Sequence, residues 1–208
     1  MLIFHDAALV VFSIPRTGST SLHKALRPFA DIEFSNPPNK KHMTVQRFET
    51  WAAKRRPRVL EYTRVAVMRE PLARMASWYR YRQRDAVKEA ETSTRDMSFA
   101  EFLELAHGEA PPPAAAVGNQ HKFLTLKSGD LGVDELFCIE RADVLMAYLR
   151  SHFGDIALPH RNSAPDIAID LDPALEARIR DLRSEEFALF SQVAPTGRYS
   201  CPRVPTAT

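Results

Sequence analysis

Short apolar runs alternate with amphipathic stretches along this chain. The run at residues 8–14 is continuous, rich in β-branched residues and followed by Pro15, which is typical of a strand buried on both faces of a parallel sheet. Residues 63–68 predict a second core strand, and shorter strands are expected at 31–34 and 135–139. Strands that alternate with helices predict an α/β domain.

Amphipathic spacing predicts the helices between these strands. Val45, Phe48 and Ala52 recur at intervals of three and four residues, so we expect a helix over 43–53. Pro71 occupies a first-turn position and begins a longer helix that is expected to reach about residue 90. The other expected helices lie at 21–26, after a Ser98 cap, at 142–153 and, as one or two helices, at 173–193.

Length and composition are those of an ordinary globular domain. The 208 residues predict a single domain, 1–208, that is long enough to bury a core without disulfides. The 28 Lys and Arg residues nearly balance the 26 Asp and Glu residues, and the resulting net charge of +2 argues against a nucleic-acid partner or a polybasic membrane binder. Two cysteines are too few for a disulfide framework or a four-ligand zinc site, so no metal is expected.

The expected location is the cytoplasm. The first residues lack the basic and long apolar regions of a secretory signal. No apolar stretch approaches the roughly 18 residues that a membrane span needs. Two segments depart from the globular pattern: residues 108–118, with three consecutive prolines, are expected to form a mobile loop, and residues 201–208 a frayed tail.

A polar loop joins the first buried strand to a helix and reads Pro-Arg-Thr-Gly-Ser-Thr-Ser over residues 15–21. A helix N-terminus offers unpaired N–H groups and a partial positive charge, which together favour phosphate. Gly18 allows a ligand to approach the backbone closely, and Arg16 adds a forked cationic donor. The loop lacks the Gly-Lys-Ser/Thr run of a Walker A motif, and a Ser/Thr-capped helix after a tight turn is the alternative interpretation.

A second segment, residues 65–79, repeats this arrangement. Arg69 follows a strand, Pro71 begins a helix, and Ser77 shares a helical face with Arg74, three residues before it. Six arginines and one acidic residue fall within residues 64–84, so a local cationic surface exists in a nearly neutral chain. A solvated basic helix face is the alternative interpretation.

The two segments together resemble the sulfotransferases that use 3′-phosphoadenosine 5′-phosphosulfate (PAPS). Residues 15–20 are similar to that family's 5′-phosphosulfate loop, with Arg16 where many members have lysine. The second segment is similar to the 3′-phosphate motif Arg-x-Pro-x-x-Arg-x-x-Ser-x-Tyr, and its matching anchors are Arg69, Pro71, Arg74, Ser77 and Tyr79. Weaker similarities to the family occur in the same order at residues 41–44, 120–124, 137–140, 158–162 and 185–190, and the first of these is to the carbohydrate-type branch.

The resemblance implies a three-layer, P-loop-like nucleotide-binding fold with a central parallel sheet. It implies in-line transfer of a sulfuryl group from PAPS to a hydroxyl of a carbohydrate or small metabolite, with PAP as the product and no metal. Arg16 would also stabilise the bridging oxygen of the leaving group. The implied nucleotide-binding residues are Arg16, Thr17, Gly18, Ser19, Thr20, Ser21, Arg69 and Ser77.

His42 is the expected general base. An imidazole with an ordinary pKa near 6.5 suits proton abstraction from a hydroxyl, and the resemblance places this segment beside the sulfur. Glu61 and Glu33 are the fallback bases, and His160 is expected to shape the site or the fold. Two other functions stay open at this point: a P-loop nucleotide kinase or phosphotransferase, and a non-catalytic nucleotide-binding module of the same fold.

Overall fold

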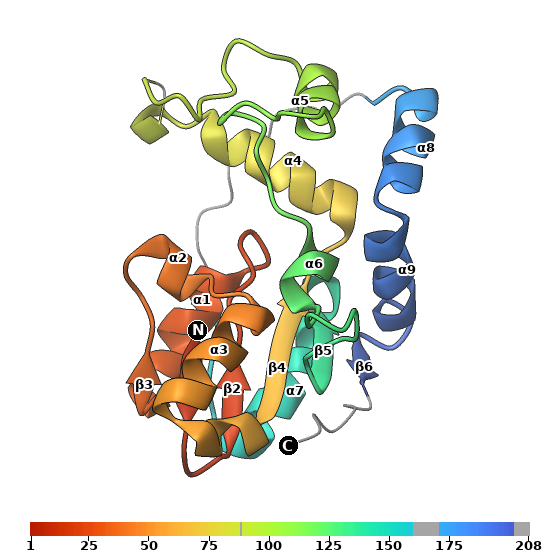
Figure 1. Ribbon diagram of the computed structural model, residues 1–208. Coiled ribbons are helices and arrows are strands. Elements are labelled where there is room, and N and C mark those ends of the chain that lie inside the picture. Colours follow the sequence, from red (N-terminus) through yellow and green to blue (C-terminus); the bar gives the residue numbers. More distant parts are fainter. Residues whose placement is uncertain (88, 160–170, 202–208) are drawn as a thin grey trace.

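A six-stranded sheet lies at the centre of the protein in the computed structural model, which describes residues 1–87, 89–159 and 171–201 (Figure 1). Its strand order is β3-β1-β2-β4-β5-β6. The strands are β1 Leu2–Phe4, β2 Leu9–Val11, β3 Ile32–Glu33, β4 Thr63–Met68, β5 Glu135–Cys138 and β6 Arg198–Ser200. The expectation of an α/β domain is therefore confirmed.

Helices fill most of the connections between the strands. The α-helices are α1 Ser19–Leu26, α2 Pro38–Lys41, α3 Val45–Arg55, α4 Pro71–Arg82, α5 Phe99–Ala106, α6 Gln120–Leu124, α7 Ala142–Phe153, α8 Pro173–Leu182 and α9 Ser184–Val193. Short 3-10 helices are η1 Arg27–Phe29, η2 Pro57–Glu61, η3 Asp85–Val87 and η4 Ile139–Arg141. None of the helices among the described residues is long and apolar enough to cross a membrane.

The sheet is parallel only at its centre. Strands β2, β4 and β5 run parallel to one another, with Val65 of β4 paired to Val11 on one side and Glu135 on the other. The outer strands β1, β3 and β6 pair antiparallel. The expected parallel sheet is thus correct for the centre and wrong for both edges. Because the three parallel strands end at the same edge, the loops after them converge there.

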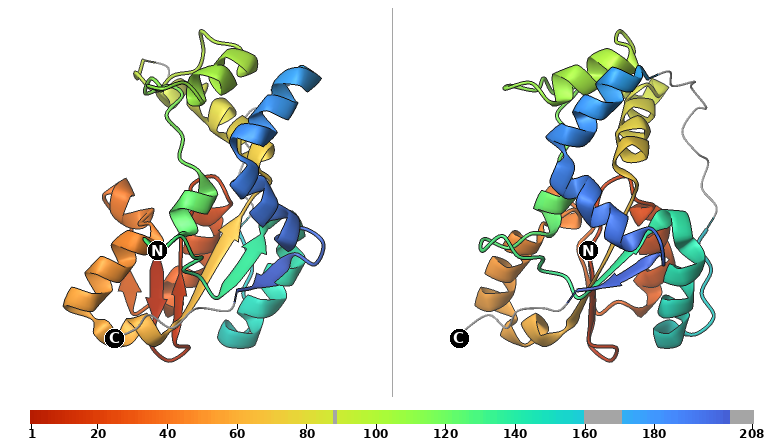
Figure 2. Two further views of the ribbon diagram at one scale, coloured as in Figure 1. Left: turned by 45° about the vertical axis from the view of Figure 1, so that its right-hand side comes forward. Right: turned by 90° about the vertical axis from the view of Figure 1, so that its right-hand side faces the viewer.

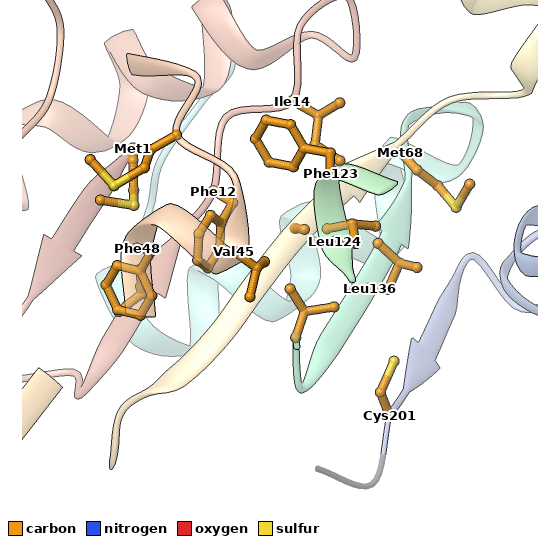
Figure 3. Packing of buried hydrophobic residues seen from close by; sticks show 14 of the residues in the cluster. Met1, Phe12, Ile14, Val45, Phe48, Met68, Phe123, Leu124, Leu136 and Cys201 are labelled. Atoms are coloured by element: carbon orange, nitrogen blue, oxygen red, sulfur yellow. The ribbon is translucent and has the colours of Figure 1, made fainter. Parts of the chain in front are cut away.

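Side chains alternate across the sheet, so each face packs under its own helices. On one face Val10, Ala66 and Leu136 pack with residues of α3, α6 and α9, and Figure 3 shows the α3 and α6 part of this cluster. On the other face Leu9 and Val67 pack with α1 and α7. The result is three layers, helices on both sides of one sheet (Figure 2).

A third apolar cluster lies beyond the edge where the parallel strands end. Met75 of α4, Phe102 of α5 and Ile179 of α8 are almost completely buried in it. Figures 1 and 2 show these three helices above the sheet, with α4 rising from the end of β4. This third cluster, called the upper cluster below, therefore holds α4 over the converging loops.

Helix α4 ends eight residues earlier than the sequence pattern predicts. Thr94, which is completely buried, donates its hydroxyl to the carbonyl of Tyr79 at 2.8 Å, and its amide donates to the carbonyl of Arg82 at 3.4 Å. The returning chain therefore satisfies carbonyl groups of the last helical turn. The expected extension to residue 90 is wrong. The residue that ends the helix lies twelve residues beyond it, outside the local pattern from which the extension was predicted.

The proline-rich segment 108–118 forms a loop that is anchored near its C-terminal end. Arg82 donates to the carbonyls of Ala114 at 2.7 Å and Ala116 at 3.1 Å, and Ala115 is completely buried. The mobility of this loop stays a prediction. Of the expected tail, Cys201 is buried and its amide donates to the carbonyl of Asp134, while residues 202–208 lie outside the described residues.

Candidate functional site

The loop after β2 has an unusual backbone. Arg16 and Gly18 both have left-handed φ angles, of 71° and 73°. For a non-glycine residue this conformation costs on the order of 1–2 kcal/mol, so other contacts must hold Arg16 in place. Thr17 closes the turn by donating its hydroxyl to the carbonyl of Ile14 at 3.0 Å. That hydroxyl is therefore occupied within the loop.

Gly18 is required at the head of α1. A Cβ atom there would lie 3.0 Å from Cδ1 of Ile139, and its positive φ also disfavours any other residue. Gly18 is the N-cap of α1, and no side chain caps this helix. Ser19 is buried, Ser21 is half-buried and Thr20 is exposed. The first turn of α1 thus offers backbone N–H groups and hydroxyls next to the loop.

The two sequence motifs meet through a hydrogen bond between side chains. Arg16 donates from Nε and Nη2 to Oγ of Ser77, at 3.1 and 3.0 Å. A second contact joins the same elements, because Nε of Arg74 donates to the carbonyl of Pro15 at 3.0 Å. The structure therefore brings the loop after β2 and helix α4 together into one site.

The site is cationic. Burial lowers the pKa of Arg16 from its ordinary value to about 10, and the positive charges of Arg84 and Arg69 contribute to this shift. Burial likewise lowers the pKa of Arg69, while the nearby carboxylate of Glu140 raises it. Arg16 remains charged at neutral pH. Two further guanidinium groups that act on Arg16 make the site suited to an anion with several charges.

Gln120 fixes the backbone of Arg69 at the end of β4. The amide of Arg69 donates to Oε1 of Gln120 at 2.9 Å, and Nε2 of Gln120 donates back to the carbonyl of Arg69 at 2.8 Å. Gln120 is completely buried, and its own amide donates to Oε1 of Glu186 at 3.0 Å. Helices α6 and α9 therefore position Arg69.

Glu186 lies at the centre of a buried network of charges. Its carboxylate has no exposed surface, accepts a hydrogen bond from Arg183 at 2.8 Å and forms an ion pair with Arg74 at 3.9 Å. Arg74 also donates to the carbonyl of Gly118 at 2.7 Å. Burial lowers the pKa of Arg74 to about 10, and the charge of Glu186 opposes this shift. Arg74 is thus a charged structural residue that joins the loop, α4 and α9.

His107 extends this network to α5. Its Nδ1 lies 2.7 Å from the carbonyl of Leu103, which can only accept, so Nδ1 carries the proton. Nε2 then accepts a hydrogen bond from Nε of Arg183 at 2.6 Å. Burial lowers the pKa of His107, so the ring is neutral at neutral pH, as this contact requires.

His42 lies beside the loop after β2, at the C-terminal end of α2. Its Nδ1 is 2.6 Å from the carbonyl of Ser13, so Nδ1 donates and Nε2 carries the lone pair of the neutral ring. Burial lowers the pKa of His42, and the charges of Lys41 and Arg74 add to this shift, while the Ser13 carbonyl opposes it. Nζ of Lys41 lies 3.5 Å from Oγ1 of Thr20 at the head of α1.

The fallback bases lie elsewhere. Glu61 precedes β4 and so lies at the opposite end of that strand from Arg69, roughly 20 Å along six residues. Glu33 is on the edge strand β3 and pairs with Arg27 at 2.8 Å. His160 lies outside the described residues. Among the described candidate bases, His42 is thus the one that lies next to the loop after β2.

Two residues of the site received no role from the sequence. Tyr81 and Arg84 lie at and just beyond the end of α4, where Tyr81 contacts Arg16. The signal was the spacing of four residues between Ser77 and Tyr81, which places both on one helical face. Across residues 1–87, 89–159 and 171–201, no group of three or more His, Cys, Asp or Glu side chains could hold a metal ion.

A family model described as "Sulfotransferase family" matches residues 1–127, which include the loop after β2, the Arg69–Ser77 segment and Gln120. A comparison with curated proteins gave no match. A comparison with solved structures gave no match either.

Removing the buried charge of Glu186 should destabilise the whole domain. The variant Glu186→Gln leaves Arg74 and Arg183 buried without their anion, and we expect it to lower the free energy of unfolding by about 3 kcal/mol. The matched control is Glu185→Gln, because Glu185 is on the same helix but its side chain is 69% exposed. Urea denaturation measures both, and an equal effect of the two variants would contradict the central role of Glu186.

Proposed function

Because this chain belongs to the sulfotransferase family, we propose that it transfers a sulfuryl group from PAPS to an acceptor hydroxyl. The observation that carries this proposal is the contact between Arg16 and Ser77, which joins the two anion-binding segments in one cationic site. The proposed acceptor is a carbohydrate or a small metabolite. The preference for a carbohydrate rests on the resemblance of residues 41–44 to the carbohydrate-type branch.

The proposed donor site uses both segments. Arg16, the backbone of residues 17–21 and their hydroxyls hold the 5′-phosphosulfate, and Arg69 with Ser77 holds the 3′-phosphate. The charge and the uncapped head of α1 fit such a ligand. Since Arg16 donates twice to Ser77, binding exchanges these bonds for bonds to phosphate oxygens.

In the proposed reaction, the chain's residues position the reactants and move one proton. Nε2 of His42 accepts the proton of the acceptor hydroxyl as its oxygen bonds to sulfur. The bond from sulfur to the bridging phosphate oxygen breaks, and its electron pair stays on that oxygen. Arg16 stabilises the developing charge by a charge-assisted hydrogen bond. PAP and the sulfated acceptor are the products.

We also propose a reducing location, the cytoplasm. Cys138 and Cys201 are both free thiols and both buried. Burial raises the pKa of Cys201 to about 12, and it raises that of Cys138 as well. Such thiols are poor nucleophiles and form disulfides slowly, so they fit a structural role in a reducing compartment.

The donor assignment predicts a preference for a 3′-phosphate. Calorimetry should show that PAP binds at least about tenfold more tightly than AMP or ATP, because a charged hydrogen bond contributes roughly 1.5–3 kcal/mol. Arg69→Ala should remove this preference, whereas Arg58→Ala, at an exposed position on η2, should leave it unchanged. Equal affinity for AMP and PAP in the wild-type chain would refute the roles given to Arg69 and Ser77.

The role of His42 predicts a pH dependence and a separation of binding from turnover. Because burial lowers the pKa of His42 below 6.5, the ring stays neutral at higher pH. The rate of PAP release from PAPS with a panel of carbohydrate acceptors should therefore be level above pH 6.5 and fall in more acidic solution. His42→Gln should lower this rate by about 10²–10⁴-fold and remove the acid limb. It should leave the affinity for PAP intact, and a His42→Gln variant with full turnover would exclude His42 as the base.

A further inference from the structure

The ring of Tyr81 lies against the arginine that joins the two motifs. Tyr81 is one helical turn after Ser77 on α4, so both side chains reach the same partner. The guanidinium carbon of Arg16 lies over the Tyr81 ring, 4.4 Å from its centroid, while the nitrogens of the same group donate to Ser77. Tyr81 and Ser77 thus both contact the side chain of Arg16 and fix its position.

Arg84 lies over the same ring. Its guanidinium carbon is 3.7 Å from the centroid of Tyr81, and its Nε donates to the Tyr81 carbonyl at 3.1 Å. The rings of Tyr81 and Trp78 are nearly perpendicular, with a centroid distance of 6.0 Å and an angle of 87°. The end of α4 and Trp78 therefore fix the Tyr81 ring, and the guanidinium groups of Arg16 and Arg84 both contact this ring.

The Tyr81 ring offsets the repulsion between the positive charges of Arg16 and Arg84. Burial and the positive charge of Arg84 both lower the pKa of Arg16. The face of an aromatic ring is electron-rich and attracts a cation above it. A planar guanidinium also stacks on the ring, which a lysine ammonium cannot do. The ring thus favours arginine, and not lysine, at position 16.

The importance of Tyr81 follows from the exchange that nucleotide binding requires. When Ser77 and Arg16 give up their mutual hydrogen bonds for phosphate oxygens, Arg16 loses one of its two described side-chain partners. A contact with Tyr81 need not compete with phosphate, because a guanidinium that stacks on a ring uses its face and leaves the N–H groups in its plane.

We propose that Tyr81 is the positioning residue of this site, which keeps the guanidinium of Arg16 in place while its N–H groups move from Ser77 to the 5′-phosphate. This inference rests on the proposed function, since it assigns Tyr81 a role in binding the nucleotide. It also accounts for arginine at a position where the resembled family often has lysine.

The test is the affinity for PAP, measured by calorimetry in the wild-type chain and four variants. Tyr81→Leu should weaken binding by about tenfold, and Tyr81→Phe, which keeps the ring, should change it by less than about twofold. In an Arg16→Lys background, Tyr81→Leu should add less than about twofold, because a lysine ammonium does not stack on the ring. If Tyr81 only supports the fold, Tyr81→Leu weakens binding equally in both backgrounds, and that result would overturn the proposal.

A second measurement needs no nucleotide. In ¹⁵N-labelled protein, the Nε–H signal of Arg16, identified by its loss in Arg16→Lys, should be shifted by the ring current of Tyr81. The shift should persist in Tyr81→Phe and vanish in Tyr81→Leu, with Tyr81→Met as the substitute if the leucine variant does not fold. A signal unchanged in the leucine or methionine variant would overturn the proposal.

The two proposals fail in different ways. A wild-type chain that does not bind PAP overturns the proposed function and with it the role of Tyr81 toward the nucleotide. A wild-type chain that binds PAP, with Tyr81→Leu binding equally well, overturns the role of Tyr81 alone.

Discussion

One buried carboxylate, that of Glu186, holds together the segments that form the site. A charge without exposed surface is tolerated only where other groups pair with it, and here the partners are Arg74, Arg183 and the amide of Gln120. Two of these partners in turn fix the backbone of the site segments. Arg74 donates to the carbonyl of Pro15 in the loop after β2, and Gln120 clamps the backbone of Arg69. The buried network around Glu186 therefore sets the spacing between the two motifs.

This constraint gives the C-terminal third of the chain a part in the site. The family match ends at residue 127, whereas Arg183 and Glu186 lie at the end of α8 and on α9. Helix α9 packs against β5 on one face of the sheet and meets the upper cluster through α8. The sheet positions the ends of the parallel strands, and the upper helices place Ser77 and Tyr81 above them. The site is thus formed at the junction of two apolar clusters.

How much of this could be predicted from the sequence depended on the range of the interactions. Helices α3 and α7 and strands β4 and β5 are long and periodic enough that their own residues specify them, and they were predicted closely. Strands β1 and β6 have three residues each and form through antiparallel partners, so no local pattern indicated them. Helix α4 ends where the remote Thr94 meets it. Likewise, the residue types of the loop indicate Arg16, but its partner Tyr81 lies 65 residues away in the chain. The sequence indicates this partner through the spacing of four residues between Ser77 and Tyr81.

In the proposed function, one nucleotide joins the loop after β2 to the Arg69–Ser77 segment. A crystal structure of the chain with PAP is the decisive test of this proposal. We expect the 3′-phosphate within hydrogen-bond distance of Arg69 and Ser77, and the 5′-phosphate on the amides at the head of α1. We also expect that Arg16 leaves Ser77 for the 5′-phosphate. PAP bound at another place, or bound with the Arg16–Ser77 contact intact, would contradict the proposal.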